Sequence, residues 1–106
     1  MRPAPLRCLL VDDESLARDV LRVLLEREPD FEVVGEAASA GEARRKLDEL
    51  APDVLFVDVC LGDTEGFDAL DAARPHTLIV FVTAFEQYAR RAFDARALDY
   101  LLKPFD

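Results

Sequence analysis

The sequence predicts an α/β domain in which five parallel strands form one sheet with helices on both faces. Two observations favour this fold. Short apolar runs alternate strictly with longer amphipathic stretches, which is the pattern of parallel strands joined by right-handed helical crossovers. The apolar runs are nearly continuous, as expected for strands that are covered on both sides. With 106 residues, of which 51% are hydrophobic, the chain can bury one core as a single domain.

The five predicted strands are apolar runs bounded by polar or turn-forming residues. They cover residues 8–11, 31–37, 54–57, 77–82 and 98–102. The second run is more polar than the first, so we expect it nearer an edge of the sheet. The third run is more apolar than the two before it and is closed by Asp58.

Four helices are predicted between these strands. Apolar residues at helical spacing predict a helix over 16–25 that is stopped by Pro29 and Asp30. Ser39 and Glu42 have the spacing of a capping box, which predicts the start of the second helix. The inner side of that helix is expected to contain Ala43, Leu47 and Leu50. The other two helices are predicted at 67–73 and 86–94.

The order of the strands predicts where a functional site lies. Five strands of this kind favour the order 2-1-3-4-5, the flavodoxin-like doubly wound arrangement, in which the first and third strands are neighbours. Ligands bind at the carboxyl ends of the strands, at the point where the order reverses. Five polar residues stand at strand ends and therefore converge on one edge of the sheet: Asp12, Asp13, Asp58, Thr83 and Lys103.

Three carboxylates and one ammonium group at the same edge predict phosphoryl chemistry. Asp12, Asp13 and Asp58 repel one another unless a cation intervenes, and Mg²⁺ prefers oxygen ligands of this kind. The metal and Lys103 would neutralise charge on a transferring phosphoryl group, and Thr83 could donate a hydrogen bond to it. An aspartate can itself be the nucleophile, which would give an acyl phosphate.

Four short motifs occur in order along the chain. They are Val11-Asp12-Asp13-Glu14, Asp58 with Gly66 eight positions later, Val82-Thr83-Ala84, and Leu102-Lys103-Pro104-Phe105. Together they resemble the receiver domain of two-component response regulators, the CheY-like family, over nearly the whole chain. The resemblance implies one receiver domain over residues 1–106, truncated before the last helix of the family's fold.

The resemblance assigns roles to the acidic residues. It implies that Asp58 is the phosphoacceptor. It also implies that Asp12, Asp13 and Asp58 bind Mg²⁺ together with the backbone carbonyl of Cys60, with Asp12 binding either directly or through water. The chain departs from the family's pattern at Gly62, where a proline usually follows the phosphoacceptor by four residues, so we expect a more mobile loop there.

The resemblance further implies a conformational switch. A sensor histidine kinase would donate the phosphoryl group to Asp58, and Thr83 and Lys103 would hold its oxygens. These residues would assist phosphorylation and dephosphorylation of the chain itself without making it a turnover enzyme. Thr83 and Tyr100 would then rearrange and change the face formed by the fourth helix and the fifth strand.

Residues 83–89 and 97–105 look most like receivers of the LytTR subfamily. That similarity implies an output domain that binds DNA and regulates transcription and that is absent from this chain. A homodimer is a further expectation from the family. The chain has 22 acidic residues against 13 basic ones, a net charge of −9, which disfavours direct binding of this domain to nucleic acid or anionic membranes.

The cysteines and apolar runs predict a cytoplasmic location. Cys8 and Cys60 stand in or beside predicted strands and form no metal-ligand cluster, so they are expected to be reduced thiols. The apolar runs are only a few residues long, whereas a membrane-spanning helix needs about 20. We therefore expect no membrane span.

Two other functions remain open from the sequence alone. A phosphatase of the haloacid dehalogenase class also forms an aspartyl phosphate, but it uses a second acid two residues after the nucleophile, where this chain has Cys60. The other alternative is a receiver-like scaffold that acts without phosphorylation.

Two of the motifs also have purely structural interpretations. Asp12, Asp13 and Glu14 could simply be the acidic start of a helix, because acidic side chains suit the first turn. Thr83 and Glu86 have capping-box spacing, so the Thr83 hydroxyl could cap a helix instead of binding a phosphoryl group.

Overall fold

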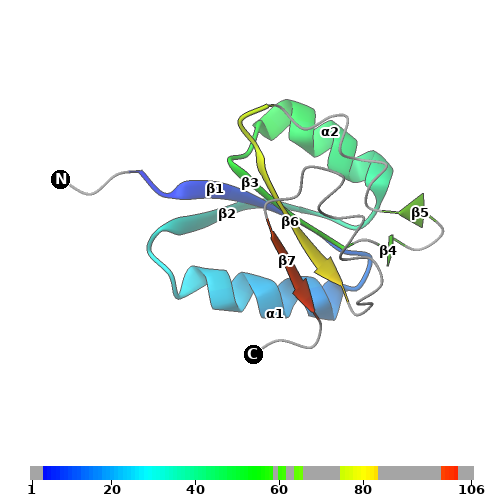
Figure 1. Ribbon diagram of the computed structural model, residues 1–106, viewed down its shortest axis with the longest axis horizontal. Helices are drawn as coiled ribbons and strands as arrows, with labels where there is room; N and C mark the ends of the chain where they lie inside the picture. The colour runs from blue at the N-terminus through cyan, green and yellow to red at the C-terminus, as the bar shows by residue number, and fades with distance from the viewer. Residues whose placement is uncertain (1–3, 59, 62–63, 66–74, 84–98, 103–106) are drawn as a thin grey trace.

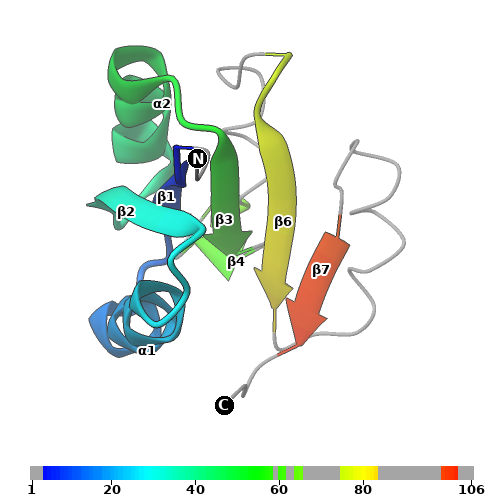
Figure 2. The same cartoon turned by 90° about the vertical axis from the view of Figure 1, so that its left-hand side faces the viewer.

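The computed structural model describes residues 4–58, 60–61, 64–65, 75–83 and 99–102. Within them, five parallel strands form one sheet in the order β2-β1-β3-β6-β7 (Figures 1 and 2). The strands are β1 (Leu6–Val11), β2 (Phe31–Ala37), β3 (Val54–Asp58), β6 (Leu78–Thr83) and β7 (Asp99–Leu102). The predicted flavodoxin-like order 2-1-3-4-5 is confirmed, with the predicted edge strand at one end of the sheet.

Two helices lie among the described residues, on opposite faces of the sheet (Figure 1). Helix α1 (Ser15–Glu26) connects β1 to β2, and α2 (Ala40–Leu50) connects β2 to β3. The helices predicted at 67–73 and 86–94 lie outside the described residues. A short antiparallel pair, β4 (Cys60–Leu61) and β5 (Thr64–Glu65), was not predicted.

Contacts between distant segments explain where the observed strand bounds differ from the predicted ones. Strand β1 begins at Leu6, two residues early, because Leu6 and Arg7 pair with the first residues of β2. Strand β6 begins at Leu78, one residue late. The preceding Thr77 is buried, and its hydroxyl group donates a hydrogen bond of 2.8 Å to the carbonyl oxygen of Pro52. Local hydrophobicity carries no information about such partners.

The start of α2 confirms the predicted cap. The Ser39 hydroxyl oxygen accepts a hydrogen bond of 3.2 Å from the backbone N–H of Glu42, which satisfies one of the unpaired donors at the helix start. Ala43 and Leu47 are buried as predicted, and Leu50 is half-buried. The predicted inner side of α2 is therefore the one that packs against the sheet.

The core fixes β1 and β3 relative to α1. Cys8 and Leu10 of β1 belong to one buried apolar cluster with Leu21 and Leu25 of α1 and Phe56 of β3. Burying an apolar side chain of this size contributes roughly 1.5–3 kcal/mol. The cluster therefore holds in register β1, which is followed directly by Asp12, and β3, which ends at Asp58.

The buried thiol of Cys8 predicts a loss of stability at alkaline pH. Burial raises its pKa from 9.0 to about 11. Between these values the thiol stays protonated in the folded chain and ionises in the unfolded chain, so stability is present below pH 9 and falls as the pH rises. This difference of about two pKa units corresponds to a loss of about 2–3 kcal/mol in the free energy of unfolding once the pH exceeds both values.

Urea unfolding of the wild type and of Cys8→Ala, at about pH 8 and about pH 10.5, measures this effect. The alanine variant should be the less stable of the two at the lower pH, because it loses buried contacts. The difference between them should shrink at the higher pH. Parallel pH dependences of the two proteins would show that the Cys8 thiol does not contribute.

Candidate functional site

Carboxylate oxygens from four residues lie within 4.8 Å of one another at one edge of the sheet. They belong to Asp12, Asp13, Glu14 and Asp58. The first three directly follow β1, and Asp58 is the last residue of β3. The predicted convergence of Asp12, Asp13 and Asp58 is therefore observed. Glu14 joins them, although no ligand role was predicted for it.

The register of the two central strands produces this convergence. Strands β1 and β3 are parallel, and Val11 pairs with Val57. The next residue along each strand is an aspartate, so Asp12 and Asp58 leave the sheet at the same level. Sequence separation plays no part in this, because the carboxyl ends of neighbouring parallel strands always share one edge.

The cluster is half buried and half open to solvent. Asp12 and Asp58 are only 6% and 7% exposed, whereas Asp13 and Glu14 are exposed. A buried carboxylate loses hydration and needs hydrogen bonds or a cation in exchange. One oxygen of Asp12 accepts a hydrogen bond of 3.0 Å from the backbone N–H of Glu14. The two exposed acids leave the cluster accessible to an ion from solvent.

Side-chain capping of α1 does not explain the cluster. Glu14 is the residue before the first turn, with extended backbone angles of φ −95° and ψ 116°, and its side chain makes no capping hydrogen bond. The first turn of α1 itself contains no acidic residue. The interpretation of this motif as an acidic helix start therefore does not account for the cluster.

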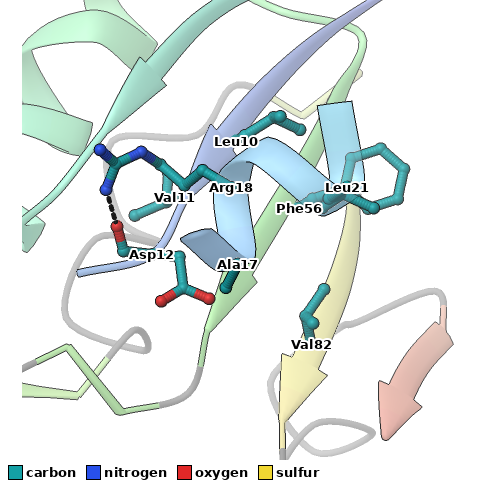
Figure 3. A pocket seen from close by; sticks show the side chains of 8 residues that line it. All are labelled: Leu10, Val11, Asp12, Ala17, Arg18, Leu21, Phe56 and Val82. Carbon is teal, nitrogen blue, oxygen red and sulfur yellow. Dashed lines mark hydrogen bonds between the residues drawn. The ribbon is translucent and has the colours of Figure 1, made fainter. Parts of the chain in front are cut away.

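The donor chemistry of the cluster suits a hard divalent cation. All four side chains offer carboxylate oxygens, and Mg²⁺ is bound in proteins by one or two carboxylates while it keeps several water molecules. A cavity of about 10 Å³ lies beside Asp12 and is lined mainly by apolar side chains (Figure 3). It has room for about one water molecule. The four carboxylates, and not this cavity, are what allow this edge of the sheet to bind a cation.

The other predicted site residues are placed only in part. Thr83 ends β6, at the edge where Asp58 ends β3, since Asp58 pairs with Val82. Tyr100 lies in β7, which ends at the same edge. Cys60 begins β4, two residues after Asp58. Lys103, directly after β7, lies outside the described residues, as do Gly62 and Gly66.

In the described part of the chain, no helix has the length and apolar character that crossing a membrane requires.

Comparison with known sequences places the chain in a family. Residues 8–106 match the response regulator receiver domain. The chain is 47% identical to the sensory transduction protein LytT of Bacillus cereus over 95% of the chain and 42% of that protein. It is 45% identical to the transcriptional regulatory protein BtsR of Escherichia coli over 95% of the chain and 43% of that protein. The chain thus spans less than half the length of these relatives.

Solved structures support the same assignment. The response regulator domain of CheB from Thermotoga maritima has a TM-score of 0.83 and 33% identity, covering 94% of this chain and 79% of that one. A chain in the complex of the CheA3 P1 domain with CheY6 from R. sphaeroides has a TM-score of 0.84 and 25% identity, covering 97% and 85%. Similarity to LytT also agrees with the predicted LytTR-type subfamily. The chain belongs to the response regulator receiver domain family and is the receiver domain of a two-component response regulator.

Proposed function

We propose that Asp58 accepts a phosphoryl group from a sensor histidine kinase in a reaction that depends on Mg²⁺. The observation that carries this proposal is the meeting of Asp58 with Asp12, Asp13 and Glu14 within 4.8 Å. Asp58 is the only member of the cluster that comes from β3, and the other three acids directly follow β1. The Asp58 carboxylate is thereby available as a nucleophile, beside acids that would bind the cation together with it.

Asp12, Asp13 and Asp58 would hold the Mg²⁺ ion, together with the backbone carbonyl of Cys60. Their oxygen donors fit this metal, and the exposed Asp13 leaves room for the ion's remaining water ligands. Bound Mg²⁺ would neutralise negative charge on the carboxylates and on the phosphoryl group. Glu14 is close enough to strengthen the negative potential at the site.

In the proposed reaction, a carboxylate oxygen of Asp58 attacks the phosphorus atom of a phosphohistidine. A new O–P bond forms and the P–N bond to the imidazole breaks, so the histidine leaves with the electron pair and takes up a proton. Water later attacks the same phosphorus atom, which releases inorganic phosphate and restores the carboxylate. Thr83 and Lys103 would hold the phosphoryl oxygens during both steps.

Phosphorylation would act as a switch because it replaces the single negative charge of the Asp58 carboxylate with a phosphoryl group that carries about two, beside acids that are already crowded. Thr83 and Tyr100 lie on β6 and β7, the strands on one side of β3. We propose that they rearrange on phosphorylation and change the face formed by residues 86–94 and β7. The chain would therefore act as a phosphoacceptor that assists its own chemistry, and not as a turnover enzyme.

Two relatives support the proposed partners. CheY6, in the structure similar to this one, is bound to the P1 domain of CheA3, which supports a histidine kinase as the phosphoryl donor. BtsR is named a transcriptional regulatory protein and is more than twice as long as its match to this chain. We therefore propose that this receiver controls an output domain that binds DNA.

The phosphoacceptor is tested by incubating the chain with Mg²⁺ and acetyl phosphate and measuring the mass of the intact protein. Wild type should gain one phosphoryl group, and Asp58→Asn should gain none, since the amide is not a nucleophile. Asp53→Asn is the matched control, because Asp53 precedes the same strand at its opposite end.

The Asp53 side chain accepts a hydrogen bond from Arg7 N at 2.9 Å, which an asparagine oxygen can also accept, so Asp53→Asn should be labelled like wild type. Omission of Mg²⁺ should prevent labelling of wild type. Equal labelling of Asp58→Asn and wild type would contradict the assignment of the nucleophile.

The metal site is tested by the stability of Asp13→Asn with and without Mg²⁺. With EDTA present, the variant should be more stable than wild type by about 1 kcal/mol, because one of the mutually repelling charges is removed. With Mg²⁺ at about 100 times its dissociation constant, wild type should gain about 2.7 kcal/mol, and Asp13→Asn should gain clearly less.

Glu49→Gln is the control for this experiment, because Glu49 is exposed on α2 and carries the same charge away from the cluster. Its response to Mg²⁺ should equal that of wild type. If Asp13→Asn also responds like wild type, Asp13 is not a ligand of the ion.

A further inference from the structure

Arg18 connects the acidic cluster to the edge strand of the sheet. Its Nε atom donates to the Glu36 carboxylate at 3.0 Å. Its Nη1 atom donates to the main-chain carbonyl oxygen of Asp12 at 2.5 Å, the bond drawn in Figure 3. The side chain of Arg18 is only 17% exposed. Arg18 thus uses two different nitrogens of one planar guanidinium group to join a strand on one side to a site residue on the other.

Glu36 is itself held from several directions. Its second carboxylate oxygen lies 2.6 Å from Arg22 Nη1, one helical turn beyond Arg18, and its main-chain carbonyl accepts a hydrogen bond from the ammonium group of Lys46 on α2. The hydrogen bond and the charge of Glu36 raise the pKa of Arg22. Arg18 is therefore anchored to a residue whose carboxylate is held by α1 and whose main chain is held by α2.

The carbonyl group that Arg18 contacts determines the course of the chain into the site. It belongs to the peptide bond between Asp12 and Asp13, which is planar. The N–H group of Asp12 donates to the carbonyl of Ala37 in β2 at 3.0 Å. Both sides of the Asp12 main chain are thus tied to neighbouring elements. The direction of that peptide plane sets where the exposed Asp13 carboxylate lies relative to Asp58.

We propose that Arg18, braced by Glu36, is a positioning residue for the cation site. This inference rests on the proposed function, since it assumes that the acidic cluster binds Mg²⁺. Arg18 acts through the Asp12–Asp13 peptide and takes no part as a ligand. It holds the acids that follow β1 in the arrangement that the ion requires before the ion arrives.

If Arg18 had a purely electrostatic role, its removal would change the affinity for Mg²⁺ in the opposite direction. If the guanidinium acted on the cluster only through its positive charge, its removal would reduce repulsion of Mg²⁺ and binding would become tighter. If Arg18 positions the peptide, its removal makes binding weaker. Loss of a partner that orients metal ligands typically weakens metal binding 10- to 100-fold. The direction of the change therefore separates the two roles.

Arg22 provides a matched control on the same helix. It pairs with the same Glu36 carboxylate, and its other ion pairs are with Asp19 and Glu26, which do not belong to the acidic cluster. Arg22→Gln removes one positive charge and one contact to Glu36, as Arg18→Gln does. Only Arg18→Gln also removes the bond to the Asp12 carbonyl.

The experiment measures the dissociation constant of Mg²⁺ by calorimetric titration of the 106-residue chain, with urea unfolding of each variant as a check on folding. Arg18→Gln should bind Mg²⁺ about tenfold more weakly than wild type. Arg22→Gln should bind within about twofold of wild type, although both variants should lose stability. Arg18→Lys keeps the charge but has a single side-chain nitrogen, whereas Arg18 uses one nitrogen for Glu36 and another for the Asp12 carbonyl. This variant should therefore also bind Mg²⁺ more weakly than wild type.

Unchanged or tighter binding by Arg18→Gln would overturn the proposal, as would equal weakening by Arg22→Gln. If Arg18→Gln does not fold, Arg18→Lys decides, and wild-type affinity in that variant would overturn the proposal. Absence of Mg²⁺ binding by wild type would instead refute the proposed function, and this inference would fall with it. Weaker binding confined to the two Arg18 variants is the result that supports positioning.

Discussion

The pairing of β1 with β3 is the constraint on which the site depends. It forces acidic residues that repel one another to one edge of the sheet, and the fold tolerates this because the strands behind them are buried. Leu10 of β1 is fully buried and Phe56 of β3 is nearly so. A shift of the register by one residue would turn these side chains to the opposite face. The apolar core therefore opposes the separation that the carboxylates favour on their own.

A set of polar contacts holds the turn that follows β1. The core fixes the strands but ends at Val11, and the next residues need contacts of their own. Asp12 obtains them through its main chain, from Ala37 on one side and Arg18 on the other. The main chain at a buried carboxylate is thereby held by a neutral main-chain group and by a cation that is already paired with Glu36.

The sequence predicted those features whose determinants are local. The limits of β2 and the Ser39 cap of α2 follow from alternation and spacing, and both are as predicted. The meeting of the acids also followed, because the strand order alone brings strand ends together. The contact between Arg18 and Glu36 could not be predicted, since it joins residues 18 apart through the packing of α1 on β2. The left-handed backbone of Ala51, at φ 42°, ends α2 and could not be predicted either, because glycine is the residue that usually marks such a position.

The strand order also divides the site into two sides with different demands. Strands β1 and β2 lie on one side of β3, and β6 and β7 lie on the other. Asp12 and Asp13, which would bind the cation together with Asp58, follow β1 on the first side, where Arg18 and Glu36 restrict the main chain. The residues proposed to respond to phosphorylation, Thr83 and Tyr100, stand on the second. A charge added at Asp58 moves one side of the site more than the other only if the β1–β2 side and the β6–β7 side differ in rigidity. Bracing on the β1 side would therefore direct the response toward β6 and β7.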